Sequence, residues 1–328
     1  MERFEYACPT SRKEAVQLLA ETWGRTEVLA GGTDLISCMK DSVSTPQRIV
    51  SLKRIEDLQG VHYAPGKGLR VGAMTTLREL MDDDNVQGRY PALIDAADGI
   101  SSEQLRTMGT IGGELLQRPR CWYFRLGYGL LAQYQGKSMP PAGDNRYHAI
   151  FGNAGPAYFV SPSSLAPILI ALGSRAALFG PRGTREIPLE KLFTTPTQPG
   201  EREHTLRPNE VLTEIMVPDP KGIRSAIYEV RQKEAMDWPL SAAAVALRMN
   251  GHSVHSARVV LGQVAPVPWL SPEAGQALVG KTLSEAVADS AGKAAVTNAT
   301  PLSMNGYKVQ LTRVAVKRAV MRAAQGGV

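Results

Sequence analysis

The stretch "TEVLAGGTDLISCMK", residues 26–40, runs from a short apolar segment through two adjacent glycines into a helix-like segment. Its first five residues are predicted to form a strand, and the residues after the glycines a helix capped by Thr33 or Asp34. Because Gly31 and Gly32 lack Cβ atoms, consecutive main-chain N–H groups can converge on one point, and a helix dipole adds to the attraction for an anion. The stretch therefore predicts an anion site, such as one for a pyrophosphate, against the alternative of a tight turn without a ligand.

A second glycine turn of the same kind occurs in "GTIGGELLQ" (109–117), again with a threonine beside the glycine pair. Strand and helix patterns alternate around the two turns, with capping boxes at Ser11–Glu14 and Thr76–Glu79. The expected strands are 48–52 and 68–74, and the expected helices are 11–23, 76–83, 90–100 and 101–108. Because a glycine pair beside a threonine occurs twice, a tight turn without a ligand becomes a weaker interpretation of either one.

The rest of the chain indicates an α+β protein with a second domain. An irregular insertion covers about 118–157, and a helix (161–174) and a strand (175–180) follow it. A proline and glycine cluster near 218–222 suits a boundary, Asn250–Gly251 predicts a hairpin, and late helices are expected after a cap at Thr282–Glu285 and over 307–324. The expected domains are 1–220, with subdomains of about 1–60 and 61–220, and 221–328.

Charge and composition exclude some classes of function. The chain has 328 residues, 43% of them hydrophobic, and a net charge of +6. Its basic residues are scattered rather than gathered among aromatics, so we expect no nucleic-acid partner. The densest basic set is predicted to form the solvated face of the last helix: Lys308, Arg313, Lys317, Arg318 and Arg322.

The cysteines and the apolar segments indicate the cellular compartment in which the protein is expected. Three cysteines without a CxxC pair predict neither a disulfide framework nor a self-contained zinc site, so a reducing compartment is the default. No signal peptide and no run long enough to span a membrane is visible. The cytoplasm is therefore expected, with the periplasm as the alternative if a partner subunit carries an export signal. His252 and His255 point to opposite faces of the hairpin and are expected at the surface.

Six segments in order resemble one family, the FAD-binding medium subunits of molybdenum hydroxylases related to xanthine dehydrogenase, carbon monoxide dehydrogenase and bacterial aldehyde oxidoreductases. The segments cover nearly the whole chain and are more specific together than either glycine turn alone. They are "LAGGTDL" (29–35), "QLRTMGTIGGELLQ" (104–117), "SPSSLAPILIALGS" (161–174), "LTEIMVP" (212–218), "YEVRQKEAMDWPLSAAAV" (228–245) and "NGYKVQLTRVAVKRAV" (305–320).

The resemblance implies a two-part FAD-binding fold of the vanillyl-alcohol oxidase (PCMH) type, followed by a domain with three antiparallel strands and helices. The first loop would wrap the FAD pyrophosphate with Leu29, Ala30, Gly31, Gly32, Thr33, Asp34 and Leu35. The second would hold the ribityl and phosphate region with Thr110, Ile111, Gly112, Gly113 and Glu114, and Ser164 would lie in the third segment. Ile100 and Leu212 fall where the family packs the isoalloxazine ring, with ordinary core packing as the alternative.

The implied function is electron transfer. FAD on this chain would receive electrons from [2Fe–2S] clusters of a small subunit and pass them to an external acceptor, while a large subunit with a molybdopterin cofactor oxidises the substrate. A dimer of such heterotrimers is one possible assembly, and no catalytic or metal-ligating residue is assigned here. Two alternatives stay open: an FAD-free scaffold or assembly subunit of the same complex, and a stand-alone flavin oxidase of the vanillyl-alcohol type.

The sequence also departs from the family pattern. Cys121 in "QRPRCWYFR" matches a branch whose flavin subunit carries a [4Fe–4S] cluster, but no cysteine follows it, so we expect no such cluster here. Glu114 stands where relatives have Asn, Ser164 where many have Asp, and Glu229 where many have Lys. The effect of these changes on flavin affinity and potential is left open. Three arginines of the insertion are expected to pair with a partner subunit's carboxylates, with pairing to a phosphate as the alternative: Arg118, Arg120 and Arg125.

Overall fold

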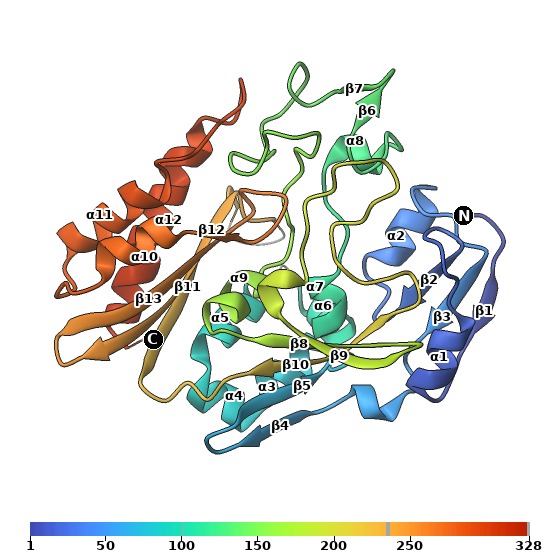
Figure 1. Cartoon of the computed structure of the whole chain (residues 1–328), viewed down its shortest axis with the longest axis horizontal. Coiled ribbons are helices and arrows are strands. Elements are labelled where there is room, and N and C mark those ends of the chain that lie inside the picture. The colour runs from blue at the N-terminus through green and yellow to red at the C-terminus, as the bar shows by residue number, and fades with distance from the viewer. Residues whose placement is uncertain (101, 234–236, 327–328) are drawn as a thin grey trace.

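The computed structural model describes residues 1–100, 102–233 and 237–326, and its three main sheets lie side by side with helices packed between and outside them (Figure 1). The strands are β1 (Glu5–Ala7), β2 (Thr26–Leu29), β3 (Arg48–Ser51), β4 (Val61–Ala64), β5 (Gly68–Gly72), β6 (Gln133–Tyr134), β7 (Lys137–Ser138), β8 (Arg175–Gly180), β9 (Gly183–Pro188), β10 (Val211–Val217), β11 (Ile223–Val230), β12 (Ser241–Asn250), β13 (Ser253–Gly262) and β14 (Trp269–Leu270).

Most helices are short. They are α1 (Arg12–Leu18), α2 (Leu35–Lys40), α3 (Leu77–Asp82), α4 (Asp84–Arg89), α5 (Pro91–Asp98), α6 (Glu103–Met108), α7 (Ile111–Leu115), α8 (Trp122–Arg125), α9 (Leu165–Ala171), α10 (Pro272–Leu278), α11 (Glu285–Ala295) and α12 (Tyr307–Ala324), with 3₁₀ turns η1 (Glu56–Leu58) and η2 (Leu189–Lys191). Among the residues that the structure describes, no helix is both long enough and apolar enough to cross a membrane.

The first two sheets present the glycine turns to each other. The N-terminal sheet is parallel, in the order β1-β3-β2, and the first glycine turn leaves the end of β2. The second sheet is antiparallel, in the order β4-β5-β10-β8-β9. Between β5 and β8 the chain forms α3 to α7 and, after the insertion, α9, so the second glycine turn lies among helices beside this sheet.

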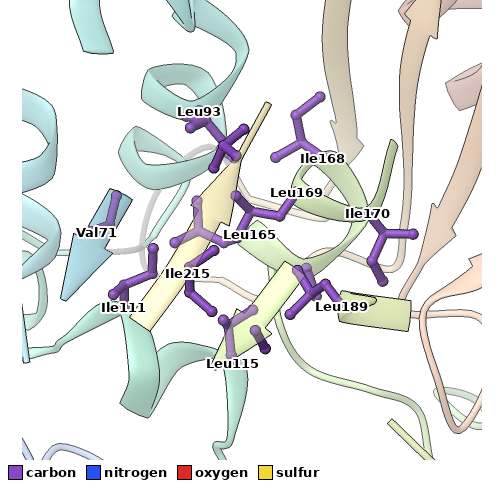
Figure 2. Close-up of a cluster of buried hydrophobic side chains, with 14 of the residues drawn as sticks. Val71, Leu93, Ile111, Leu115, Leu165, Ile168, Leu169, Ile170, Leu189 and Ile215 are labelled. Atoms are coloured by element: carbon purple, nitrogen blue, oxygen red, sulfur yellow. The ribbon is translucent and has the colours of Figure 1, made fainter. Parts of the chain in front are cut away.

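Helix α9 lies at the centre of the molecule. All seven of its residues are buried, which explains why "LAPILIA" shows no polar face. Its side chains meet those of the second sheet and of α5, and Figure 2 shows Leu165, Ile168 and Leu169 near Leu93 and Ile215. On its other side α9 contacts β12 and β13, so one apolar core joins the second sheet to the C-terminal sheet.

The C-terminal sheet is antiparallel, in the order β11-β12-β13-β14, and α10, α11 and α12 cover its outer face (Figure 1). The antiparallel sheet with helices is confirmed, with the two-residue β14 added to the three strands that the resemblance implied. The hairpin is confirmed as well, although Gly251 and His252 form its loop because Asn250 still pairs with Ser253. Residues 241–247 of β12 are all buried because the sheet is covered on both faces. The domain boundaries, including the division at 220/221, stay predictions.

The insertion is held by the C-terminal part of the chain. Asn145 donates to Ser303 Oγ at 3.0 Å and accepts from Met304 N at 2.9 Å, while Asn305 donates to His148 O at 3.1 Å. Trp122 packs edge-on against Tyr147 at 5.5 Å between ring centroids. Side-chain hydrogen bonds and aromatic packing thus organise the segment.

Several local predictions were wrong. Helix α1 ends at Leu18 instead of continuing to residue 23. Helix α11 begins at Glu285 with Ser284 as its cap, so Thr282 is not the capping residue. Lys308 does not belong to a solvated face: it is 1% exposed, because the insertion and the end of β13 cover this side of α12.

Candidate functional site

The two glycine turns are in direct contact. A Cβ atom on Gly31 would lie 1.9 Å from the carbonyl oxygen of Met108, and one on Gly112 would lie 2.8 Å from the carbonyl oxygen of Ala73. Real Cβ atoms do not approach backbone atoms so closely, so only glycine permits this packing. Gly32 has φ +84°, a conformation that L side chains rarely adopt. The structure therefore requires glycine at 31 and 112 because the backbone of another segment lies too close for a Cβ atom, and at 32 because the backbone is left-handed there.

The two turns differ in the hydrogen-bond donors that they leave free. In the second turn the N–H groups of Ile111 and Gly112 bond to Thr75 O and Ala73 O, both at 2.9 Å, and that of Gly113 bonds to Thr110 Oγ1 at 3.1 Å. By contrast, the N–H groups of residues 31–34 have no hydrogen-bond acceptor among the residues that the structure describes. The first turn therefore carries the donors for an anion, and the second supplies a close-fitting wall.

A large cavity, with about 1200 Å³ of empty space counted out to the open solvent, is bordered by both turns. Its predicted residues are Ala30, Gly31, Gly32, Thr33, Asp34, Leu35, Thr110, Gly112, Gly113 and Leu212. A small cavity of about 720 Å³ adjoins it and shares Thr33, Asp34, Gly113 and Gln117. The small cavity adds the predicted residues Ile100, Glu114 and Ser164.

Not every predicted site residue faces a cavity. Leu29 and Ile111 border neither and are buried in the apolar core. Ile100 lines only the small cavity and Leu212 only the large one. Ile100 and Leu212 thus line different cavities, which adjoin each other at Thr33, Asp34, Gly113 and Gln117.

Asp34 lies where the two cavities meet and is surrounded by the arginines of the insertion. Its carboxylate accepts from Arg118 N at 2.7 Å and pairs with the guanidinium groups of Arg125 at 2.8 Å and Arg120 at 3.0 Å. Arg118 pairs with Glu203 at 2.5 Å. These arginines thus pair with carboxylates of their own chain, and the expectation that they pair with a partner subunit was wrong.

Glu114 caps helix α9 from a distant segment. Its buried carboxylate accepts from Ser164 N at 2.6 Å, Ser163 Oγ at 2.7 Å and Leu165 N at 3.3 Å. Burial, opposed by these hydrogen bonds, raises the pKa of Glu114 to about 7. The carboxylate that replaces the family's asparagine thus satisfies the free N–H groups at the start of α9.

Replacing Glu114 with glutamine should flatten the dependence of stability on pH. The folded pKa of about 7 exceeds the ordinary 4.5, so the folded state binds the proton more tightly than the unfolded state. The resulting stability is fully present below pH 4.5 and is lost as pH rises through 7. Across this window the free energy of unfolding of the parent should fall on the order of 3 kcal/mol more than that of Glu114→Gln.

Urea unfolding at a series of pH values measures this difference. Glu56→Gln, at an exposed position, should keep the parent's slope. If the free energy of unfolding of Glu114→Gln fell with pH as steeply as that of the parent, protonation of Glu114 would not be the cause of the pH dependence.

Ser164 lines the small cavity, and Glu229 lies behind Gly99 of its wall. Glu229 is paired with Arg231, and both side chains face Gly99, where an added Cβ would meet them. Burial raises the pKa of Glu229. Because Arg231 accompanies it, the glutamate that replaces the family's lysine does not leave an uncompensated negative charge. Residues 234–236 of the same segment lie outside the described part of the chain.

One wall of the large cavity was not predicted from any sequence pattern. Arg202 pairs with Glu27 at 2.5 Å and lies 4.7 Å from the centroid of the Trp23 ring, which His204 meets edge-on at 5.3 Å. Burial raises the pKa of Glu27 to about 7 and lowers that of His204 to about 4. The loop before β10 therefore closes the cavity over β2, a contact between segments with no shared motif.

No group of three His, Cys, Asp or Glu side chains in residues 1–100, 102–233 and 237–326 could hold a metal ion. His252 and His255 are exposed on the hairpin, as expected.

Family models match both parts of the chain. Residues 2–220 match the FAD binding domain in molybdopterin dehydrogenase, and residues 226–323 match the CO dehydrogenase flavoprotein C-terminal domain. The carbon monoxide dehydrogenase medium chain of Hydrogenophaga pseudoflava is 30% identical over 326 residues, 98% of this chain and 97% of its own length. The FAD-binding subunit of an aldehyde oxidoreductase of Escherichia coli is 29% identical over 320 residues, 95% of this chain and 96% of its own length.

Solved structures are similar over the whole length. A reconstituted CO dehydrogenase from Oligotropha carboxidovorans has a chain with a TM-score of 0.78 and 28% identity, with 99% of each chain covered. A carbon monoxide dehydrogenase from H. pseudoflava has one with a TM-score of 0.77 and 29% identity, covering 99% of this chain and 98% of its own.

Proposed function

This chain belongs to the FAD-binding medium subunits of molybdenum hydroxylases, and from that premise we propose that it transfers electrons from a small iron–sulfur subunit to an external acceptor. It is thus the flavoprotein subunit of a molybdenum-containing oxidoreductase. The observation that carries the proposal is the contact between the two glycine turns, with free N–H groups of residues 31–34 where the two cavities meet.

The residues present fit FAD. In the proposed placement the pyrophosphate lies against the N–H groups of Gly31 to Asp34, because two adjoining cavities must share the middle of an elongated ligand. The adenosine end occupies the large cavity, with Leu212 on its wall and Trp23, Glu27 and Arg202 closing it. The isoalloxazine ring occupies the small cavity beside Ile100.

The protein's part in electron transfer is to bind, orient and shield the cofactor. FAD supplies the redox chemistry, because it accepts and releases electrons singly or in pairs. Apolar Ile100 and Leu105 exclude water from the small cavity. Glu114 holds α9, and with it Ser164, against the same cavity. Asp34 holds the insertion across the junction through Arg118, Arg120 and Arg125.

The partner subunits follow from the same family membership. The proposed complex contains a large subunit with a molybdopterin cofactor, where the substrate is oxidised, and a small subunit with [2Fe–2S] clusters. Two such heterotrimers would form the assembly. This chain needs no catalytic acid or base, because the substrate reacts on another subunit.

The visible spectrum of the purified full-length chain tests the proposal. We expect flavin absorbance in about equal molar amount to protein, released as FAD by acid. Flavin that stays covalently attached after acid treatment would favour a vanillyl-alcohol-type oxidase. A colourless chain that still binds its partner subunits would favour a scaffold subunit, and either result would contradict the proposal.

A further inference from the structure

Glu114 is a buried carboxylate on the wall of the small cavity, where the proposed function places the isoalloxazine ring of FAD. It lies on α7 and is 7% exposed, and Ser164 at the start of α9 lines the same cavity. Behind Gly99 of the cavity wall lies the carboxylate of Glu229, whose side chain is 9% exposed. A charge that changes inside the small cavity therefore acts on two buried carboxyl groups beside it.

The carboxylates that line the small cavity differ in how their charge is compensated. Asp34 pairs with the guanidinium group of Arg120 at 3.0 Å. Asp237 is partly exposed and accepts from three main-chain N–H groups between 2.9 and 3.1 Å. Among the residues that the structure describes, the donors to Glu114 are all uncharged. Glu114 is thus both buried and without a positive partner in the described residues, a combination that the other two do not share.

The ionised and protonated forms of Glu114 are close in free energy because opposing effects act on its carboxyl group. Burial disfavours the ionised form, hydrogen bonds from Ser163 Oγ at 2.7 Å and Ser164 N at 2.6 Å favour it, and the negative charge of Glu229 disfavours it. Together these effects raise the pKa of Glu114 to about 7. Arg231, which pairs with Glu229, is the positive charge on that side.

Reduction of FAD in the small cavity would change the charge that Glu114 experiences. When the ring takes up two electrons and one proton, it gains one net negative charge. A negative charge near a buried carboxylate favours the protonated form, because water screens the repulsion poorly there. The pKa of Glu114 should therefore be higher beside the reduced ring than beside the oxidised one.

We propose that Glu114 takes up a proton from water when the flavin in the small cavity is reduced and releases it when the flavin is oxidised. This inference rests on the proposed function and adds a residue that couples its electron transfer to proton uptake. In the balanced step the ring gains two electrons from the iron–sulfur partner and one proton from water, and the Glu114 carboxylate gains a second proton from water. The new O–H group then donates to Ser163 Oγ, a hydroxyl that can turn from donor to acceptor.

The test measures the midpoint potential of FAD bound to the full-length chain over a range of pH. The potential is read from the visible spectrum in equilibrium with redox dyes. Just above the pKa of about 7, the parent's potential should fall more steeply with pH than that of Glu114→Gln. The difference should reach up to about 30 mV per pH unit, the value for one further proton in a two-electron reduction.

Glutamine is a suitable replacement because it can keep the contacts of the carboxylate. Its oxygen accepts from Ser164 N, and its amide nitrogen donates to Ser163 Oγ, so FAD should be retained. Glu56→Gln removes a carboxylate at an exposed position and should keep the parent's slope.

Ser163→Ala tests the direction of the effect and decides the matter if Glu114→Gln does not fold or retain FAD. Ser163 borders neither cavity of the proposed FAD site, and its hydroxyl donates to the Glu114 carboxylate. Without this hydrogen bond the ionised form is less favoured, so the steep part of the curve should move to higher pH. A purely structural role for Glu114 predicts no such shift.

Parallel curves for the parent and Glu114→Gln, with FAD bound to both, would overturn the inference and leave the proposed function intact. An unshifted curve for Ser163→Ala, or one moved to lower pH, would do the same. A full-length chain that binds no FAD would contradict the proposed function, and this coupling with it.

Discussion

Alanine in place of Gly31 should abolish the retention of FAD. The added Cβ would lie 1.9 Å from the carbonyl oxygen of Met108 and 2.8 Å from its carbonyl carbon. Because both are backbone atoms, the two glycine turns must move apart, which displaces the N–H groups proposed to bind the pyrophosphate. We expect FAD affinity to fall more than about 100-fold and the free energy of unfolding to fall by about 3 kcal/mol.

The FAD content of the purified variant, read from its visible spectrum, and urea unfolding measure the two effects. Gly88→Ala is the matched control, because a Cβ at that helical position meets nothing within 4 Å. It should keep the parent's flavin and be as stable or up to about 1 kcal/mol more stable, since alanine favours helices. A Gly31→Ala chain with full flavin would refute the close contact of the turns.

Methionine in place of Lys308 should cause the largest loss of stability. The Lys308 ammonium group is buried and donates to the carbonyl oxygens of Tyr147, His148 and Gln263 at 3.2, 3.2 and 2.7 Å. Methionine fills similar space but leaves the carbonyl groups of Tyr147 and Gln263 without this donor, each at a cost of roughly 1–3 kcal/mol. The carbonyl group of His148 still accepts from Asn305. Relief from burying a charge offsets part of the loss, so we expect a decrease of about 4 kcal/mol in the free energy of unfolding.

Lys317→Met tests the same change on the same helix at the surface. Lys317 pairs with the exposed Glu285 at 2.6 Å, and such pairs contribute about 0–1 kcal/mol. In urea unfolding, Lys308→Met should lose far more free energy of unfolding than Lys317→Met. Equal losses would show that the insertion does not depend on Lys308.

Several elements that local signals specify agree with the sequence-based prediction. Strand β8 was predicted at 175–180 and helix α12 at 307–324, and both have these bounds. The capping box at Thr76 and Glu79 begins α3. Periodicity, caps and turn residues act within a few positions, so a single sequence carries them.

The candidate site was only partly predictable. The glycine turns could be recognised because their chemistry is local, and the structure brings them into contact. The exclusion of Ile111 from the cavities, the position of Ile100 and Leu212 in different cavities, and the cover from Arg202 and His204 could not be predicted. Each depends on how segments far apart in the chain pack together.

The sequence by itself determined the order of the elements, the two glycine turns and the family. Tertiary structure decided which charges are paired and which are buried. Asp34 pairs with Arg120 and Arg125 of an insertion remote in sequence, and Lys308, which the sequence places on a basic helix face, donates to backbone from two other segments. The physical reason is that burial and desolvation depend on all surrounding segments at once, whereas helix, strand and turn signals depend on near neighbours in the chain.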